Sequence, residues 1–413
     1  MTNFDISFIG NGIISYISAV KLKKKFPRLK VSIVGPSSRK YSASIAAGAM
    51  HAAFCEVEST FYSHHRERQY FQAALESRPL WHQFLEELNL TEAVTSNSTI
   101  MYKRNKGTIF EKSNFDLACD LAKEYDVLRE VSKKEIDIIF QGSLKNHDIS
   151  AMRFEGEFSI DTEFLFSKLD EIVLKLGINV IDQKVLRVIK EDKKNCLTLE
   201  TINNNFIKSE KVVIAAGSQS SNLLDKKYGV VPIFNAVGTA MVLNNYPEGY
   251  LNLNEVIRTP NRGGAQCGIH IVPRLKNRFY LGASNYISVE EPAHRLESIR
   301  YLIDLCEIEL YGRRNIYKSK ADLFIGSRAK SIDGYPLLGS LKNLSGVFIA
   351  SGNYRVGLTL APLIANEIIS WHEKNKVSEK FFKWAPDRKL NSYISMKAAQ
   401  DYYVESRLSN LFE

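Results

Sequence analysis

Short apolar runs and amphipathic stretches alternate along most of the chain. The first apolar run, at residues 6–9, predicts a buried strand, and a helical period follows it and ends before Pro27. A second strand is predicted at residues 31–34. Strand, helix and strand in this order are typical of a parallel sheet covered by helices, so the pattern predicts an α/β fold class. Further strands are predicted at 179–181, 185–188, 211–216 and 347–350, and further helices at 59–90, 162–169 and 362–371.

A second type of pattern fills residues 232–324, where strand-like runs follow one another closely. Examples lie at 237–242, 270–274 and 278–283. This change of pattern predicts a separate β-rich lobe, inserted between parts of the first domain.

A glycine turn, Gly10-x-Gly12-x-x-Ser15, joins the first strand to the first helix. Gly10 permits a tight turn, Gly12 lets the backbone approach a pyrophosphate, and Ser15 is small enough for close packing of helix on strand. The N–H groups at the start of the helix then hold the phosphates. We therefore predict a dinucleotide site here, and a purely structural turn is the alternative.

Two other segments of small residues, 42–50 and 215–218, have two interpretations: a close approach to a ligand or a structural turn. A glycine-rich stretch at residues 351–362 lies between a predicted strand and a predicted helix. In the last case the helix N-terminus would be directed inward, and its dipole would stabilise negative charge on a bound ring.

The composition narrows the class of protein. Of the 413 residues, 45% are hydrophobic and 24% are charged, which is ordinary for a globular protein and excludes wholesale disorder. The net charge is +9, but the basic residues are spread along the chain, so a solvated surface explains them better than a nucleic acid partner does.

The five cysteines are scattered and odd in number, and neither they nor the eight histidines show the spacing of a metal site. We expect a reducing compartment, a cytoplasmic location and no bound metal. The apolar stretch at residues 6–20 is too short and too polar to span a membrane, and residues 1–5 lack the basic residues of a signal peptide.

The order of these motifs resembles the D-amino-acid oxidase superfamily of FAD-dependent amine oxidases, and within it glycine oxidase and sarcosine oxidase-like enzymes. The resemblance extends from the start of the chain to about Arg388. The motifs that carry it are Gly10-x-Gly12-x-x-Ser15, Ser44-x-Ala46-Ala47-Gly48, Ala215-Ala216-Gly217, Val272-Pro273-Arg274, Gly326-x-Arg328, Asp333-Gly334-x-Pro336-x-x-Gly339 and Gly352-x-x-Arg355-x-Gly357-x-x-x-Ala361-Pro362.

The resemblance implies a Rossmann-like FAD-binding domain of the glutathione-reductase type with an inserted β-rich α+β substrate domain. The FAD domain would comprise residues 1–85, 150–231 and 325–388, and the substrate domain residues 86–149 and 232–324. Residues 389–413 run past the resemblance, and their pattern predicts a C-terminal helical extension.

It also implies a reaction. A hydride would pass from the carbon of a carboxylate-bearing amine, an amino acid or N-substituted amino acid, to flavin N5. The resulting imine would be hydrolysed, and oxygen would yield hydrogen peroxide. FAD is expected to be non-covalent, because no cysteine stands where the sarcosine oxidases attach it. A homo-oligomer is left open.

The resemblance assigns Arg328 to the substrate carboxylate, and Arg355 to a second polar position, where an ion pair is the alternative. It places His270 beside the substrate, with a hydrogen-bonded strand histidine as the alternative. His51 is expected near the flavin, with the core or the surface as alternatives. FAD contacts are expected from Gly10, Gly12, Ile13, Ile14, Ser44, Ala47, Gly48, Met50, Ala216, Gly217, Gly352, Gly357, Leu358 and Thr359.

Two departures from the family pattern bear on the cofactor and the substrate. Gly35 stands where an acidic residue should bind the ribose, which leaves Ser37 or Ser38 to supply a weaker hydrogen bond. Ala329 replaces the proline that usually follows the arginine. These differences predict a divergent member whose substrate is not glycine.

Three other functions stay open. A dehydrogenase would pass electrons to a quinone or a carrier protein, with Phe381, Phe382 and Trp384 facing a membrane or partner. A protein acting on modified tRNA is permitted by the charge, although no aromatic and basic groove is evident. A non-catalytic flavoprotein would follow if the nucleotide site has decayed at Gly35.

Overall fold

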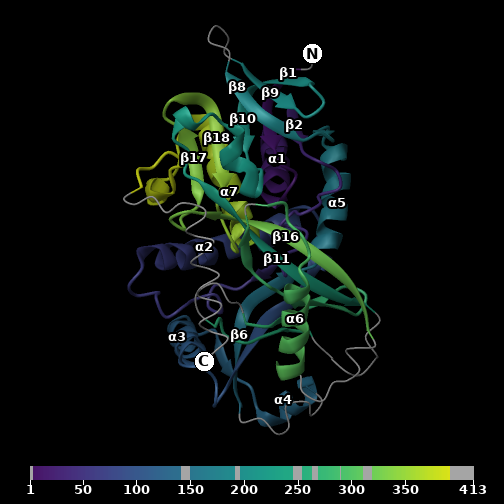
Figure 1. Ribbon diagram of the computed structural model, residues 1–413, viewed down its shortest axis with the longest axis vertical. Coiled ribbons are helices and arrows are strands. Elements are labelled where there is room, and N and C mark those ends of the chain that lie inside the picture. The colour runs from purple at the N-terminus through teal and green to yellow at the C-terminus, as the bar shows by residue number, and fades with distance from the viewer. Residues whose placement is uncertain are drawn as a thin grey trace.

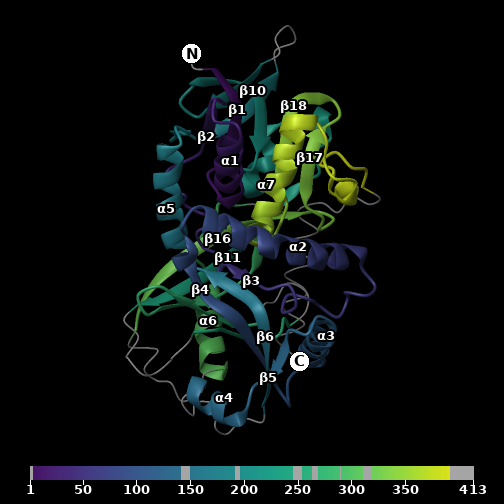
Figure 2. The same ribbon diagram turned by 180° about the vertical axis from the view of Figure 1, so that it is seen from behind.

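The computed structural model describes residues 3–140, 149–190, 196–244, 254–262, 268–288, 290–309 and 319–390. Two sheets form its two halves, and helix α2 (His65–Glu87) crosses between them (Figures 1 and 2). The α/β fold class and a second, β-rich half are therefore confirmed.

The first sheet has a parallel centre in the order β18-β10-β1-β2-β7, with β17 and the β8–β9 hairpin added antiparallel. Its central strands are buried on both faces, which explains why they appear in the sequence as continuous apolar runs. The strands are β1 (Asn3–Ile9), β2 (Val31–Val34), β7 (Asn179–Ile181), β8 (Val185–Lys190), β9 (Leu197–Thr201), β10 (Phe206–Ile214), β17 (Leu337–Leu341) and β18 (Leu344–Ser351).

Alternate residues of these strands point to two different cores. On one face, Val213 and Phe348 pack against helices α1 (Ile13–Lys25), α5 (Thr162–Lys175) and α7 (Gly357–Lys374). On the other face, the neighbouring residues along the same strands pack against the β8–β9 hairpin. The parallel centre is thus covered by helices on one side and by strands on the other.

The second sheet has ten strands in the order β15-β11-β14-β13-β12-β4-β6-β3, with β16 on β11 and β5 on β6. Helices α3 (Ile109–Glu124), α4 (Lys133–Phe140) and α6 (Leu296–Glu309) lie in the same half (Figure 2). The strands are β3 (Met50–His51), β4 (Val94–Arg104), β5 (Leu128–Glu130), β6 (Ile149–Ile160), β11 (Ile233–Asn244), β12 (Val256–Arg258), β13 (His270–Arg274), β14 (Arg278–Gly282), β15 (Tyr286–Ser288) and β16 (Lys320–Ser331).

Some predicted limits differ from the structure. Strands β6 and β16 pair within the second sheet, although their residues fall largely in segments that we assigned to the FAD domain. Our division into domains therefore stays a proposal, and most of the predicted C-terminal helix, from residue 391 on, lies outside the described residues.

The aromatic residues near residue 380 do not form an exposed cluster. Phe381 and Trp384 are buried, and the Trp384 indole donates to Gln69 Oε1 at 3.2 Å, so only Phe382 faces outward. Among the described residues, no helix is long and apolar enough to cross a bilayer. Cys55, Cys119 and Cys196 are free thiols.

Candidate functional site

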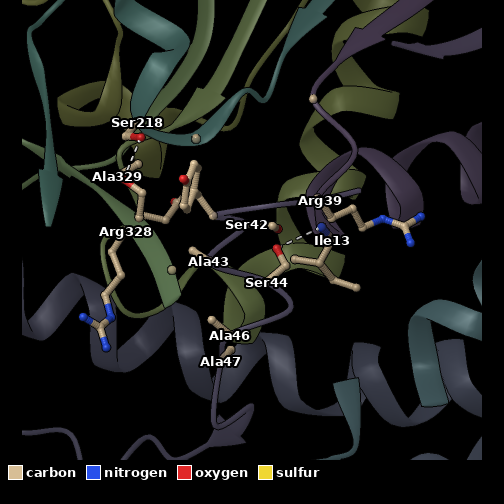
Figure 3. Close-up of a pocket in the computed structure, with 18 of the residues that line it drawn as sticks. Ile13, Arg39, Ser42, Ala43, Ser44, Ala46, Ala47, Ser218, Arg328 and Ala329 are labelled. Carbon is tan, nitrogen blue, oxygen red and sulfur yellow. Dashed lines mark hydrogen bonds between the residues drawn. The ribbon is translucent and has the colours of Figure 1, made fainter. Parts of the chain in front are cut away.

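A cavity of about 750 Å³ opens where the first glycine turn, residues 35–50, strand β16 and the start of α7 meet (Figure 3). This volume is in the upper part of the range of about 300–1,000 Å³ that ligand sites occupy. Of the seventeen predicted site residues, the cavity is lined by all but one: Gly10, Gly12, Ile13, Ile14, Ser44, Ala47, Gly48, Met50, Ala216, Gly217, His270, Arg328, Arg355, Gly357, Leu358 and Thr359.

The first glycine turn is shaped for close backbone approach. Gly10 has a φ of +103°, and a Cβ there would lie 2.4 Å from the Ala215 carbonyl oxygen, so no side chain fits. Gly12 precedes α1 without a side-chain cap. The Ile13 amide donates to Ser44 Oγ at 3.1 Å, which ties the turn to residues 42–50 (Figure 3).

Helix α7 directs its N-terminus at the same cavity. The first amides of any helix have no partner from within the helix. Helix α7 begins at Gly357, and its N-cap residue supplies no side-chain hydrogen bond to them. Gly357, Leu358 and Thr359 all line the cavity. Two helix N-termini therefore converge there, and both favour an anionic group.

The small-residue segment is held in place by side chains of the second sheet. A Cβ on Gly48 would lie 3.0 Å from the Tyr280 ring, whose hydroxyl donates to the Ala46 carbonyl at 3.2 Å. The buried Arg274 guanidinium donates to the carbonyl oxygens of Ala47, at 2.6 Å, and of Ile160. The sequence motifs include Arg274 without giving it a role, and Tyr280 lies outside them.

Arg328 reaches the cavity from β16. Its Nη1 donates to Ser284 O and to Asn285 Oδ1, each at 3.2 Å. A Cβ on Gly238 would lie 2.2 Å from Nη1, so this glycine leaves the space in which the guanidinium lies. In the described part of the chain, no carboxylate pairs with Arg328.

Unlike Arg328, Arg355 has a carboxylate partner: its Nη2 pairs with Glu58 Oε1 at 3.0 Å. The alternative that we considered for this residue, an ion pair, is therefore present. Behind Arg355, a second cavity of about 160 Å³ is lined by Lys330, Glu58 and Tyr70, among others. Burial, reinforced by Arg355, lowers the pKa of Lys330 to about 8.

His270 lines the cavity from β13 beside a partly buried ion pair. Glu56 Oε1 accepts from Arg258 Nη1 at 2.6 Å, and the Arg258 side chain is fully buried. Burial opposes the ionisation of Glu56, but the Arg258 guanidinium prevails and lowers its pKa to about 2. Burial, reinforced by Arg258, lowers the pKa of His270 to about 3, so its ring is neutral, and its Nε2 has no described partner.

Two residues that we associated with the cofactor do not line the cavity, and for His51 the core was one of the expected alternatives. His51 does not line the cavity, and its ring stacks on Phe158 with 4.2 Å between centroids. Gly352 does not line it either. A φ of +72°, with Leu337 Cδ1 2.8 Å from any added Cβ, explains that glycine by packing and turn geometry alone.

The geometry fits FAD. An elongated dinucleotide needs backbone that can approach closely, donors for a diphosphate and an apolar bed for a flat ring. One cavity supplies all three: the first glycine turn allows the close approach, the two helix N-termini provide the donors, and the small side chains at residues 46–50 form the apolar bed.

Comparison with known proteins gives the same cofactor. Residues 5–371 match the family DAO, FAD dependent oxidoreductase. The glycine oxidase of Geobacillus kaustophilus is 24% identical over 369 residues, which are 87% of this chain and 90% of that protein. Its crystal structure superposes with a TM-score of 0.77 at 19% identity, covering 95% of this chain and 100% of that chain.

The bifunctional protein ThiO/ThiG of Synechocystis is 24% identical over 402 residues, or 95% of this chain. The match covers 55% of that protein, so the chain spans only about half the length of this relative.

Proposed function

Since the chain belongs to the DAO family of FAD-dependent oxidoreductases, we propose that it oxidises the carbon–nitrogen bond of an amino acid or an N-substituted amino acid. The observation that carries this proposal is Arg328. Of the three arginines that line the cavity, Arg39 pairs with Asp170 and Arg355 with Glu58, and among the described residues Arg328 alone has no carboxylate partner. A planar guanidinium without a carboxylate partner of its own is suited to bind a substrate carboxylate.

The surroundings of Arg328 support this role. Its hydrogen bonds to Ser284 and Asn285 fix the guanidinium, and Asn285 in turn donates to the Tyr354 hydroxyl at 2.9 Å. A fixed fork binds a carboxylate with less loss of conformational freedom than a mobile one. Arg355 has its own carboxylate in Glu58, so we assign it the role of a positioning residue beside the site.

His270 would contact the other end of the substrate. Its ring lines the cavity and is neutral, so it can pack beside an uncharged amine without adding charge, while its Nε2 is buried. No dedicated base is required when the amine binds without its extra proton. When bound, FAD would supply the hydride acceptor for oxidation of the substrate carbon, and water would hydrolyse the resulting imine.

We propose oxygen as the electron acceptor, which gives hydrogen peroxide. A peroxide assay over amino acids and N-methyl amino acids tests this directly. Turnover that needs an added quinone or dye, without peroxide, would identify a dehydrogenase instead.

The carboxylate role is tested by Arg328→Ala. We expect KM to rise about 10- to 100-fold, because a charge-assisted hydrogen bond contributes about 1.5–3 kcal/mol. The visible flavin spectrum should not change, since the substitution lies at the substrate end. Arg328→Lys should recover part of the loss.

Arg300→Ala is the matched control, because Arg300 lies on the exposed surface of α6 and pairs only with Asp304 in the described chain. If Arg328→Ala and Arg300→Ala had the same KM as the wild type, the carboxylate assignment would be wrong. A cytoplasmic location and a homo-oligomer remain predictions, which fractionation and light scattering test.

A further inference from the structure

The end of β2 is built differently from the usual dinucleotide fold. Gly35 occupies the position of the expected acidic residue, and its φ is not in the left-handed region. A Cβ there would lie 3.0 Å from Asn11 N and 3.1 Å from Asn11 Cγ. The glycine is therefore explained by Asn11, whose backbone N and side chain both lie in the space beside it.

Asn11 is the residue between Gly10 and Gly12, and it lines the cavity although only 8% of its surface is exposed. Its side-chain amide contacts the Pro36 carbonyl at 2.5 Å. Because a carbonyl oxygen can only accept, the atom in this contact is the Nδ2 donor. The amide oxygen, Oδ1, has no hydrogen-bond partner among the described residues.

The position of Asn11 is fixed from several sides. Arg39 Nε donates to the Asn11 carbonyl at 3.4 Å, and Arg39 is itself held by Asp170, with Nη1 2.9 Å from Oδ2. The amide of Gly10 donates to the Val34 carbonyl at 2.8 Å. These contacts join the glycine turn to β2, so the acceptor at Asn11 is preorganised.

Ser37 and Ser38, the two serines expected to bind the ribose, differ in whether they line the cavity. The amide and hydroxyl of Ser37 donate to the two carboxylate oxygens of Asp182 at 2.7 and 2.6 Å, and Ser37 does not line the cavity. Our expectation for Ser37 is therefore not supported. Ser38 does line the cavity, and the Lys40 amide donates to its hydroxyl at 3.4 Å.

We propose that Asn11 Oδ1 accepts a hydrogen bond from a hydroxyl of the adenosine ribose of FAD, in place of the missing carboxylate at position 35. This inference rests on the cofactor and does not depend on the substrate. A neutral amide forms a weaker hydrogen bond to a hydroxyl than a carboxylate does, so the adenosine end of FAD is held less tightly than by an acidic residue.

The test compares ADP with 2′-deoxy-ADP and 3′-deoxy-ADP as probes of the apoprotein, by calorimetry. The wild type should bind ADP about 3- to 10-fold more tightly than at least one deoxy analogue, which corresponds to one neutral hydrogen bond. In Asn11→Ala this preference should fall below about twofold, whereas Ser38→Ala should keep it. FMN, which lacks the adenosine, should bind equally well to the wild type and both variants.

Two results would overturn the proposal: an unchanged preference in Asn11→Ala, or its loss in Ser38→Ala alone. A weaker binding of FMN by Asn11→Ala would show instead that the side chain only shapes the turn. None of these measurements depends on turnover, so they are independent of the proposed amino acid substrate.

A residue exchange tests the pairing of positions 11 and 35. Gly35→Glu alone should weaken FAD binding and lower the melting temperature, because its side chain meets Asn11. Asn11→Gly with Gly35→Glu removes the contacts with the Asn11 side chain, keeps the contact with its backbone N, and places an acidic residue at the ribose position. The double variant should therefore bind FAD more tightly than Gly35→Glu alone. Additive losses in the double variant would contradict the pairing.

Discussion

Buried histidines show how single residues depend on their surroundings. His51 has 3% of its surface exposed, and neither ring nitrogen has a described hydrogen-bond partner. Burial, reinforced by His82, lowers its pKa to about 3, and His270 is lowered to a similar value. Both rings are therefore neutral at physiological pH, and neither adds positive charge to the site.

This predicts a loss of stability in acid. The folded pKa of His51 is below the unfolded value of about 6.5, so protons favour the unfolded chain and stability falls as the pH drops from 6.5 towards 3. At pH 5, the burial of neutral His51 lowers the free energy of unfolding by about 2 kcal/mol relative to its value at high pH. His51→Phe should make the unfolding free energy depend less steeply on pH, by the equivalent of up to one proton taken up on unfolding. Urea denaturation at pH 5–7 measures this slope.

His270→Gln offers a comparison for this experiment, because it removes the other buried imidazole near the cavity. Equal slopes of unfolding free energy against pH in the wild type and in both variants would contradict the assignment of neutral, buried rings.

At the scale of elements, the start of α7 is decided by a neighbouring helix. The sequence pattern predicts this helix from about residue 362, and proline is tolerated best in the first turn of a helix. The helix begins five residues earlier, at Gly357. Pro362 cannot donate to the Leu358 carbonyl, and the Trp81 indole of α2 donates to it instead, at 3.1 Å. The cavity-facing turn of α7 thus depends on α2.

Trp81→Phe should therefore destabilise the protein by about 1–3 kcal/mol, because a buried carbonyl loses a partner. The loss should be smaller in a Pro362→Ala background, where residue 362 gains an N–H group that reaches Leu358. A double-mutant cycle measured by denaturant unfolding checks this coupling. Equal losses in both backgrounds would contradict it, and would indicate that the indole acts through packing alone.

At the scale of the whole molecule, both sheets contribute to one cavity. Arg274 from the second sheet holds Ala47, while Gly10 and Gly12 come from the first. A ligand bound there contacts both halves only when both are folded. FAD at 100 times its Kd should therefore raise the unfolding free energy by about 2.7 kcal/mol.

Arg274→Met should weaken FAD binding and reduce this gain at a fixed FAD concentration, as thermal unfolding with and without FAD would show. Arg278→Met is the control, because Arg278 is partly exposed and pairs with Glu163 and Asp161 away from the cavity. If the two variants gained the same stability from FAD, Arg274 would have no part in holding the site.

Many of the elements could be predicted from local pattern, because hydrophobic period and glycine turns act over a few residues. The strand at residues 31–34 and the helix ending before Pro27 lie where local pattern predicts them. The order of motifs also identified the family, since glycines such as Gly10 are required by backbone geometry that any member must repeat.

Which charged side chains have partners depends instead on how the chain folds. Nothing in the sequence pairs Arg355 with Glu58, almost three hundred positions away, or leaves Arg328 without a carboxylate in the described chain. Likewise, Gly35 is a missing acid in the sequence and a space occupied by Asn11 in the fold. Such contacts depend on distances between segments far apart in the chain, and local pattern carries no information about those distances.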